Sequence, residues 1–551
     1  MTVRSETAAD APLVSVDRLS VEFPAENGPV RAVHELSFTL PPGGALGIVG
    51  ESGSGKSTAA YALLGLHHGT GARLTGSVRV AGHDVTAAGE AELRRLRGAT
   101  AAMVFQDPLS SLDPYQAVGD QIAEVYRVHH RNASRRAARA RAVEVLDRVG
   151  IPDAARRARS RPHEFSGGQR QRALIAMAVA CGPRLLVADE PTTALDVTVQ
   201  AQILALLREL REETGMGLVL VTHDLGVAAG GVDELLVMKD GRAVEHGPVR
   251  TVLDAPREPY TRALLDAVPR VEVRRAPVPR EEPPGDDSVL LEAVGLRQEF
   301  GRGRRAVTAL DDVSLTVRAG ETVGVVGESG SGKTTLGRAL VRLLAPTAGE
   351  IRYRGRDIGA LNDRALRPFR SELQMVFQDP VSSLNPRRSI GESIADPLRA
   401  AGRLTDARIV ARVRDLLDRV GLDPDAYHRY PHEFSGGQRQ RVGIARALAP
   451  EPRLIVCDEP VSALDVTTQA QVVALLGELQ RELGIALVFI AHDLAVVRQV
   501  SDRLAVMRHG AIVEEGPADA VYDRPEHPYT RGLLAAVPRV DAVARTSPAG
   551  V

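Results

Sequence analysis

The chain has 551 residues, more than a single hydrophobic core usually supports, so we expect at least two domains. Its formal net charge is -1 at pH 7, aromatic residues make up 3% and tryptophan is absent, which argues against nucleic-acid binding and base-stacking platforms. No run of about 18 consecutive apolar residues and no basic leader with an apolar core occurs, so we expect neither a membrane-spanning helix nor a secretion signal.

The second half of the chain repeats the motifs of the first half in the same order. HEFSGGQRQR at 163–172, for example, recurs unchanged at 432–441. The duplication predicts two units of the same fold, at residues 12–270 and 289–541.

Two stretches lie outside the repeat. Residues 271–288 are proline-rich and charged and have no apolar period, which is typical of a linker. At about 3.1 Å per residue such a linker would reach roughly 55 Å, enough to let the two units face one another. We expect the last residues, 542–551, to form a disordered tail.

Taken in chain order, each unit alternates apolar runs with helical patterns. ALGIVG and TVGVVG precede glycine-rich loops, LLVADE and LIVCDE end in paired acids, and LVLVTH and ALVFIAH end in histidine. Buried apolar strands with polar residues at their carboxyl ends predict an α/β fold, with an open parallel sheet covered by helices on both faces. Residues 115–165 and 387–434 have helical spacing and predict an inserted helical subdomain. VMKDGRAVEHG and VMRHGAIVEEG predict β-hairpins.

Both glycine-rich loops satisfy G-x-x-x-x-G-K-[ST], the phosphate-binding P-loop. Its glycines let backbone amides converge on phosphate oxygens, and the following helix directs its positive end at them. The lysine should contact the β- and γ-phosphates, and the hydroxyl after it should bind Mg²⁺. The predicted ATP-binding residues of the loops are Gly50, Glu51, Ser52, Gly53, Ser54, Gly55, Lys56, Ser57 and Thr58, and Gly327, Glu328, Ser329, Gly330, Ser331, Gly332, Lys333, Thr334 and Thr335. The third lysine of the chain, Lys239, is expected in a surface turn.

Acids and histidines follow the other apolar runs. The pairs Asp189–Glu190 and Asp458–Glu459 end predicted strands, where a buried aspartate needs a partner such as magnesium. The glutamates are placed to polarise an attacking water. A lone histidine at a strand end is usually a packed core residue, but the repeat and the aspartate that follows favour a γ-phosphate contact for His223 and His492.

The repeated Ser-Gly-Gly-Gln has two compatible interpretations. Ser-x-x-Gln is a capping box that starts a helix, and a helix start with two glycines and open amides is also an anion site. Because each unit already has a P-loop, this element is predicted to close over a nucleotide held by the other unit. The residues are Ser166, Gly167, Gly168 and Gln169, and Ser435, Gly436, Gly437 and Gln438.

In this order, the P-loop, the glutamine of FQD, the SGGQ signature, the Asp-Glu pair, the ALD loop and the terminal histidine resemble the ATP-binding cassette ATPases. The resemblance covers nearly the whole chain, twice. It implies two tandem P-loop NTPase domains, each a RecA-like parallel-sheet core with an inserted helical subdomain and an antiparallel β subdomain, which pair head to tail around two ATP molecules. Both sites are expected to hydrolyse ATP.

The same resemblance assigns further residues. It implies that Gln106 and Gln378 form the glutamine loops and that Asp196 and Asp465 form the D-loops. The implied magnesium ligands are Ser57, Gln106, Asp189, Thr334, Gln378 and Asp458. Adenine would stack on Phe23 and Phe300, although an aromatic at such a position is more often part of the core.

FQDPxSSLxP and the tails REPYTRALLDAVPR at 257–270 and HPYTRGLLAAVPRV at 527–540 look like those of oligopeptide, dipeptide and nickel importer ATPases, here as a fused pair. This implies two membrane permeases and an extracytoplasmic solute-binding protein as partners, and a place on the cytoplasmic side of the cell membrane. The sequence departs from the pattern at REPYT. Some members also carry a cysteine cluster near this tail, and this chain has no cysteine after Cys457, so we expect no iron–sulfur centre. Cys181 and Cys457 are expected to be buried thiols.

The alternative is a soluble dual-cassette protein acting on the ribosome, which would usually carry a longer, helical interdomain segment. A DNA-repair ATPase would need zinc-type cysteines or long heptads. The basic stretch 131–147 is by default a solvated helix face, with contact to a permease or to lipid as the other interpretation. The transported substrate, whether dipeptide, oligopeptide, glutathione or nickel chelate, is not encoded in these motifs.

Overall fold

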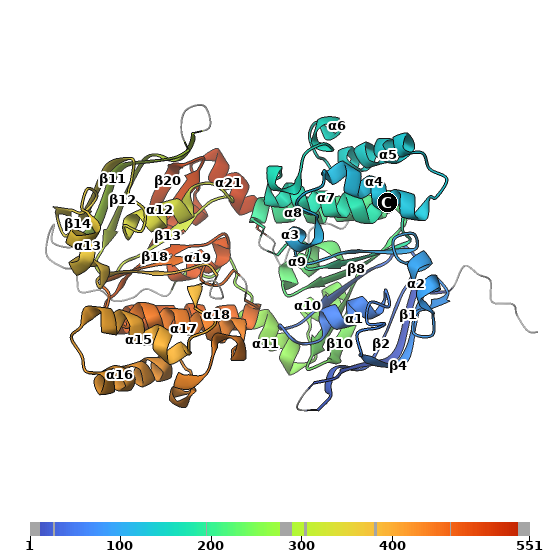
Figure 1. Ribbon diagram of the computed structural model, residues 1–551, viewed down its shortest axis with the longest axis horizontal. Helices are drawn as coiled ribbons and strands as arrows, with labels where there is room; N and C mark the ends of the chain where they lie inside the picture. The colour runs from blue at the N-terminus through green and yellow to red at the C-terminus, as the bar shows by residue number, and fades with distance from the viewer. Residues whose placement is uncertain are drawn as a thin grey trace, which may run out of the picture. The chain divides into compact units, whose positions relative to one another are not determined.

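The computed structural model describes residues 11–25, 28–193, 195–275, 289–301, 306–379, 383–462 and 464–537. The chain forms two compact units, the first mainly from residues up to Val268 and the second from Pro269 to Val537 (Figure 1). The predicted tail, 542–551, and most of the predicted linker, 276–288, lie outside the described residues.

The core of the first unit is a six-stranded sheet in the order β10-β9-β3-β8-β7-β6, in which all neighbours are parallel except β9 and β10. Every residue of β3, β7 and β8 is buried, as the uninterrupted apolar runs predict for parallel strands covered on both faces. The strands are β3 (Ala45–Val49), β6 (Ala101–Val104), β7 (Leu185–Asp189), β8 (Gly217–Thr222), β9 (Glu234–Lys239) and β10 (Arg242–Pro248).

A second, antiparallel sheet belongs to the same unit, with the order β2-β1-β4-β5. Its strands are β1 (Val14–Phe23), β2 (Val30–Leu40), β4 (Arg73–Val80) and β5 (His83–Asp84). Apolar residues of both sheets and of α1 share one buried cluster, which joins the two sheets into one body.

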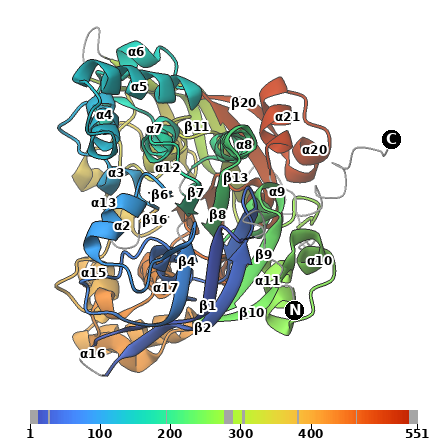
Figure 2. The same ribbon diagram turned by 90° about the vertical axis from the view of Figure 1, so that its right-hand side faces the viewer.

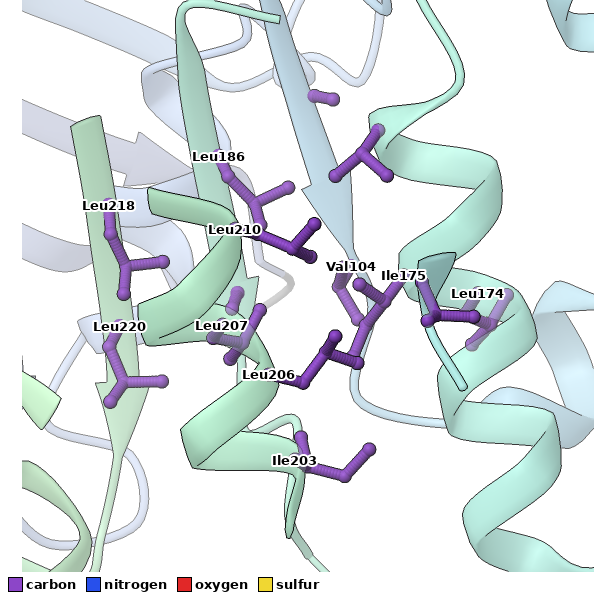
Figure 3. Packing of buried hydrophobic residues seen from close by; sticks show 14 of the residues in the cluster. Val104, Leu174, Ile175, Leu186, Ile203, Leu206, Leu207, Leu210, Leu218 and Leu220 are labelled. Carbon is purple, nitrogen blue, oxygen red and sulfur yellow. The ribbon is translucent and has the colours of Figure 1, made fainter. Parts of the chain in front are cut away.

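The helices of the first unit are α1 (Lys56–Ala62), α2 (Glu90–Leu96), α3 (Pro108–Ser111), α4 (Val118–His129), α5 (Arg135–Arg148), α6 (Ala154–Arg157), α7 (Gly167–Val179), α8 (Val197–Thr214), α9 (Leu225–Gly231), α10 (Val249–Asp254) and α11 (Pro259–Ala267), with a 3₁₀ turn η1 (Pro162–Glu164). Figure 2 shows α4, α5 and α6 grouped away from β1, β2 and β4, which is the predicted helical subdomain. Figure 3 shows leucines of α8 packed against leucines of β7 and β8, and Ile175 of α7 beside Val104 of β6.

The second unit repeats this architecture. Its six-stranded sheet has the order β16-β17-β18-β13-β19-β20, and its antiparallel sheet has the order β12-β11-β14-β15. The strands are β11 (Val289–Phe300), β12 (Val307–Arg318), β13 (Thr322–Val326), β14 (Ala348–Tyr353), β15 (Arg356–Asp357), β16 (Leu373–Val376), β17 (Leu454–Asp458), β18 (Ala486–Ile490), β19 (Arg503–Arg508) and β20 (Ala511–Pro517).

The helices of the second unit follow the same order as those of the first. They are α12 (Lys333–Leu340), α13 (Asp363–Arg370), α15 (Ile390–Ala401), α16 (Asp406–Arg419), α17 (Gly436–Leu448), α18 (Val466–Leu483), α19 (Leu494–Val500), α20 (Ala518–Asp523) and α21 (Pro528–Ala535), with 3₁₀ turns η4 (Pro424–His428) and η5 (Pro431–Glu433). The structure thus confirms the predicted α/β fold in both halves.

Several local predictions can be compared with the structure. The hairpins β9–β10 and β19–β20 are antiparallel, as predicted, and Lys239 is exposed beside the turn of the first. Cys457 is buried and its burial raises the pKa of its thiol to about 12. Cys181 is only half-buried, contrary to prediction, because it follows the end of α7 rather than lying inside a strand. Among the described helices, none has the length and apolar content needed to cross a membrane.

Candidate functional site

The sheet order brings the predicted site residues to one edge in each unit. In the first unit, β3, β8, β7 and β6 are neighbours, and the P-loop, His223, the Asp189–Glu190 pair and Gln106 lie at or just after their carboxyl ends. The second unit has the same order in β13, β18, β17 and β16. Carboxyl ends of parallel strands are where open α/β sheets bind ligands.

The P-loops connect β3 to α1 and β13 to α12. Lys56 Nζ donates to the carbonyl oxygens of Gly50 (2.9 Å) and of the next residue (2.7 Å), and Lys333 Nζ does the same with Gly327 at 2.7 Å. These glycines adopt φ values of 151° and 153°, and an added Cβ would lie 2.2 Å from the carbonyl oxygen of a methionine in β9 or β19. A side chain at either position would collide with that carbonyl oxygen, so only glycine fits there.

A hydroxyl and a buried carboxylate meet beside each P-loop. Ser57 Oγ donates to Asp189 Oδ1 at 3.0 Å, and Thr334 Oγ1 donates to Asp458 Oδ1 at 2.9 Å. Burial raises the pKa of both aspartates, so each carboxylate gains from a cation. Hydroxyl and carboxylate oxygens are the ligands that Mg²⁺ prefers, so the residues present fit that ion.

Glu190 is the centre of a hydrogen-bond network in the first unit. Its Oε2 accepts from Gln106 Nε2 at 2.7 Å and from Thr193 Oγ1 at 2.9 Å. His223 Nδ1 lies 3.2 Å from the other carboxylate oxygen, Oε1. The glutamate therefore touches the residues that follow β6 and β8 as well as its own loop.

The second unit repeats this network with small differences. Gln378 Nε2 donates to Glu459 Oε2 at 2.7 Å, and His492 Nδ1 lies 3.6 Å from the same oxygen. Both glutamates have φ 47°, a left-handed conformation that costs energy in residues other than glycine. The same strain at both positions aims both carboxylates into the site.

The histidine and glutamate of each unit shift each other's pKa. Burial alone would raise the pKa of Glu190, but the hydrogen bond and charge of His223 outweigh it and lower the pKa. Burial would likewise lower the pKa of His223, and the glutamate raises it instead. Glu459 and His492 shift in the same directions for the same reasons. At neutral pH both glutamates are therefore ionised, as a general base must be.

The signature residues start α7 and α17 and form the predicted capping boxes. Ser166 Oγ accepts from the backbone N of Gln169 at 3.3 Å, and the glutamine side chain accepts from the serine N at 3.2 Å. Ser435 and Gln438 pair in the same way at 3.3 and 2.9 Å.

The second glycine of each signature makes a close approach. A Cβ on Gly168 would lie 2.5 Å from a methyl of Val199, and one on Gly437 would lie 2.2 Å from a methyl of Thr468. Both serines are exposed, so each helix presents a hydroxyl and its first amides at the surface of its own unit.

The predicted D-loop aspartates stand directly before equivalent helices, α8 and α18. Asp465 is the N-cap of α18, where its Oδ1 accepts from the backbone N of Thr468 at 3.0 Å. Asp196 accepts on Oδ1 from Thr198 Oγ1 at 2.6 Å.

The predicted adenine-stacking aromatics are placed less uniformly. Phe23 ends β1 and is half-buried, with its ring edge-on to His67 at 5.5 Å. That histidine bonds to the carbonyl oxygen of Thr58 in α1 at 2.8 Å, so Phe23 is connected to the P-loop helix. Phe300 ends β11 and is 45% exposed. The position equivalent to His67 is Leu344, so the second unit cannot make this connection.

The tails contribute tyrosines that the sequence analysis did not assign to the site. The hydroxyl of Tyr529 in α21 accepts from the backbone N of Glu328 in the P-loop at 2.9 Å, and Tyr260 in α11 does the same for Glu51 at 3.3 Å. The PYT motif was visible as a family feature, but only the fold brings it to the phosphate loop. His527 further caps α21 through Nδ1, a bond that Glu258 does not make in the REPYT tail.

Tyr529→Phe is expected to weaken ATP binding at the second P-loop several-fold, because the Glu328 amide loses a partner worth about 1 kcal/mol. The longer bond of Tyr260 predicts a smaller loss for Tyr260→Phe. Titration of a fluorescent ATP analogue against each variant measures both effects. Equal affinities in wild type and Tyr529→Phe would show that the hydroxyl does not shape the loop.

Comparisons with known proteins agree with this geometry. The family described as "ABC transporter" matches residues 33–193 and 310–462, and the family described as "Oligopeptide/dipeptide transporter, C-terminal region" matches 244–289 and 513–550. The glutathione import ATP-binding protein GsiA of Escherichia coli O6:H1 is 48% identical, over 96% of this chain and 89% of that protein. GsiA of E. coli K12 is 47% identical and that of Shigella flexneri 48%, with the same coverage.

Proposed function

Because this chain belongs to the ABC transporter family, as an importer-type ATPase with two cassettes, we propose that it energises uptake of a small peptide-like solute through partner permeases. The substrate class we propose is glutathione, dipeptides or oligopeptides. The observation that carries the proposal is the pair of complete sites, each followed by its own peptide-transporter tail.

Each site has the groups that ATP hydrolysis needs. In the first unit, Lys56 and the loop amides would bind phosphates, and Ser57 with Asp189 would hold Mg²⁺, which neutralises phosphate charge when bound. Glu190, ionised and hydrogen-bonded to Gln106, would orient and deprotonate the attacking water. The second unit carries the same set, so we propose that both sites turn over.

We further propose that each nucleotide is completed by the signature of the other unit. The exposed capping-box serines support this, because their helix starts are anion sites not used by their own P-loop networks. In this mechanism ATP holds the two units together, and hydrolysis with product release lets them part.

A cavity of about 770 Å³ in the second unit is a candidate docking site for a permease segment. It is lined by Gln378 and Asp458 of the site and by Pro397 of α15 in the helical subdomain. A partner segment seated there would contact the glutamine loop directly, and we propose that the permeases dock at this position. The chain would then lie on the cytoplasmic face of the cell membrane, with an extracytoplasmic solute-binding protein delivering the substrate.

The alternative of a ribosome-acting dual-cassette protein has no support from the comparisons, since the matched families and relatives are transport proteins.

Reconstitution tests the substrate class. The chain, its partner permeases and a solute-binding protein should together give ATP-dependent uptake of radiolabelled glutathione or a dipeptide into proteoliposomes. Liposomes with the Glu190→Gln, Glu459→Gln variant are the matched control. Absence of uptake of glutathione, dipeptides and oligopeptides by a complex that still hydrolyses ATP would reject the substrate class and leave the ATPase assignment standing.

A further inference from the structure

The first residues of the predicted linker, 271–275 with the sequence VEVRR, pack on the second unit. Val271 lies against the hydrophobic core of that unit, and its carbonyl oxygen accepts a 2.7 Å hydrogen bond from Arg498 Nη1. The Arg498 side chain is 5% exposed and also donates to Asp519 and Asp523. A buried cation therefore fixes the backbone of the segment.

Two arginines of the segment form ion pairs with the same unit. Arg275 Nη1 lies 2.7 Å from Asp502 Oδ2, and Arg275 Nη2 donates to Gln480 Oε1 at 3.2 Å. Arg274 Nη2 lies 2.7 Å from an oxygen of Asp523. Arg275 is 15% exposed and Arg274 is 63% exposed, so the first pair is the stronger one.

In the first unit, an arginine of helix α8 makes the ion pair that Arg275 makes in the second unit. There Arg211 of α8 donates to the Gly43 carbonyl oxygen at 2.8 Å and to Asp233 Oδ2 at 2.8 Å. Asp233 in turn accepts from the backbone N of Ala45 at the start of β3. One helix arginine thus ties α8 to the beginning of the P-loop strand.

In the second unit this arginine is replaced by Gln480. The glutamine keeps the bond to the equivalent carbonyl, that of Gly320, and Asp502 still accepts from the Thr322 backbone N at 2.8 Å. Arg275 brings a guanidinium to Asp502, as Arg211 does to Asp233. The segment therefore supplies a group that α18 does not.

The other contacts are also specific to the second unit. Arg498 corresponds to Ala229 and Asp519 to Arg250, so the first unit has neither the buried cation nor one of its two acidic partners. We call Gln480, Arg498, Asp502, Asp519 and Asp523 the docking patch and residues 271–275 the basic clip.

We propose that the basic clip is a docking segment of this chain whose receptor is the docking patch, with Arg275 in the place that Arg211 takes in the first unit. The described residues on either side of 276–288, namely 271–275 and β11, then both belong to the second unit. The covalent connection between the units is confined to the residues around Val268 and Arg270.

Gln480→Arg in the full-length chain tests the docking. By analogy with the Arg211–Asp233 pair, the new arginine should form an ion pair with Asp502 and displace Arg275. Asp502 then keeps a cationic partner on α18. Hydrogen exchange followed by mass spectrometry should then show amides 271–275 exchanging roughly tenfold faster than in wild type. Arg275→Ser should have the same effect, by removing the group from the segment itself.

Gly477→Arg is the matched control, because it introduces the first unit's Arg208 on the same helix at a position with nothing within 4 Å of an added Cβ. It should leave the exchange of 271–275 unchanged. Exchange in the Gln480→Arg and Arg275→Ser variants as slow as in wild type would overturn the proposal. The readout is independent of ATP hydrolysis, so it does not depend on the proposed function.

Discussion

Replacing Glu190 and Glu459 together by glutamine is expected to lower ATP turnover by about 10²–10⁴-fold while leaving ATP binding intact. The amide has nearly the same shape and keeps a hydrogen-bond acceptor for Gln106 and Gln378, which now donate to the carboxylates at 2.7 Å. It cannot take a proton from water. Phosphate release measures turnover, and binding of a fluorescent ATP analogue measures affinity.

Glu124→Gln with Glu478→Gln makes the same chemical change at two exposed helix positions and should leave both quantities unchanged. Wild-type turnover in the Glu190, Glu459 variant would refute the general-base assignment. Loss of ATP binding in the same variant would instead mean that the carboxylates hold the nucleotide.

The second prediction concerns which signature completes which site. In a chain carrying Glu190→Gln, Glu459→Gln and Lys56→Ala, nucleotide should bind only at the P-loop of Lys333. Adding Ser166→Ala is expected to weaken that binding by about 10–100-fold, because a hydrogen bond to charged phosphate contributes about 1.5–3 kcal/mol. Adding Ser435→Ala instead should have little effect.

The two serines are matched controls for each other. Each caps an equivalent helix with a 3.3 Å bond to its own glutamine amide, so loss of the cap costs both variants about 1 kcal/mol of stability. Any difference in ATP affinity between the two variants then shows which serine lies at the nucleotide bound by the P-loop of Lys333. A larger loss from Ser435→Ala would place the signature beside the P-loop of its own unit and refute the shared-site proposal.

Much of the site was predictable because its chemistry is carried by contiguous residues. The P-loop pattern predicts a loop between a strand and a helix, and Ser57 with Asp189 follows from two apolar runs that end in polar residues. Parallel strands bring their carboxyl ends to one edge of the sheet, so motifs that follow different strands meet there even though they are far apart in the sequence. The capping boxes were predictable for the same reason, since Ser166 and Gln169 are neighbours on one helix turn.

The contacts of the tails were not predictable in this way. Tyr529 and Glu328 are 201 positions apart, and no periodicity indicates that a phenol will accept from a P-loop amide. Phe23 and Phe300 share only the dipeptide Glu-Phe, and the second unit has Leu344 where the first has His67, so the surroundings of the two rings differ while adenine stacking stays a prediction for both. Side-chain partners across a fold depend on packing angles, which local sequence patterns do not encode.

The sequence by itself determined the duplication, the α/β class and the chemical groups at each strand end, because strand burial, helix capping and phosphate loops depend on residues close together in the chain. Only the tertiary structure decided where VEVRR lies. Composition made it part of a linker, but α18 carries Gln480 where α8 carries Arg211, and Arg275 pairs with Asp502. Asp502 is 23% exposed, and which segment brings a cation to it depends on the folded chain rather than on the local sequence.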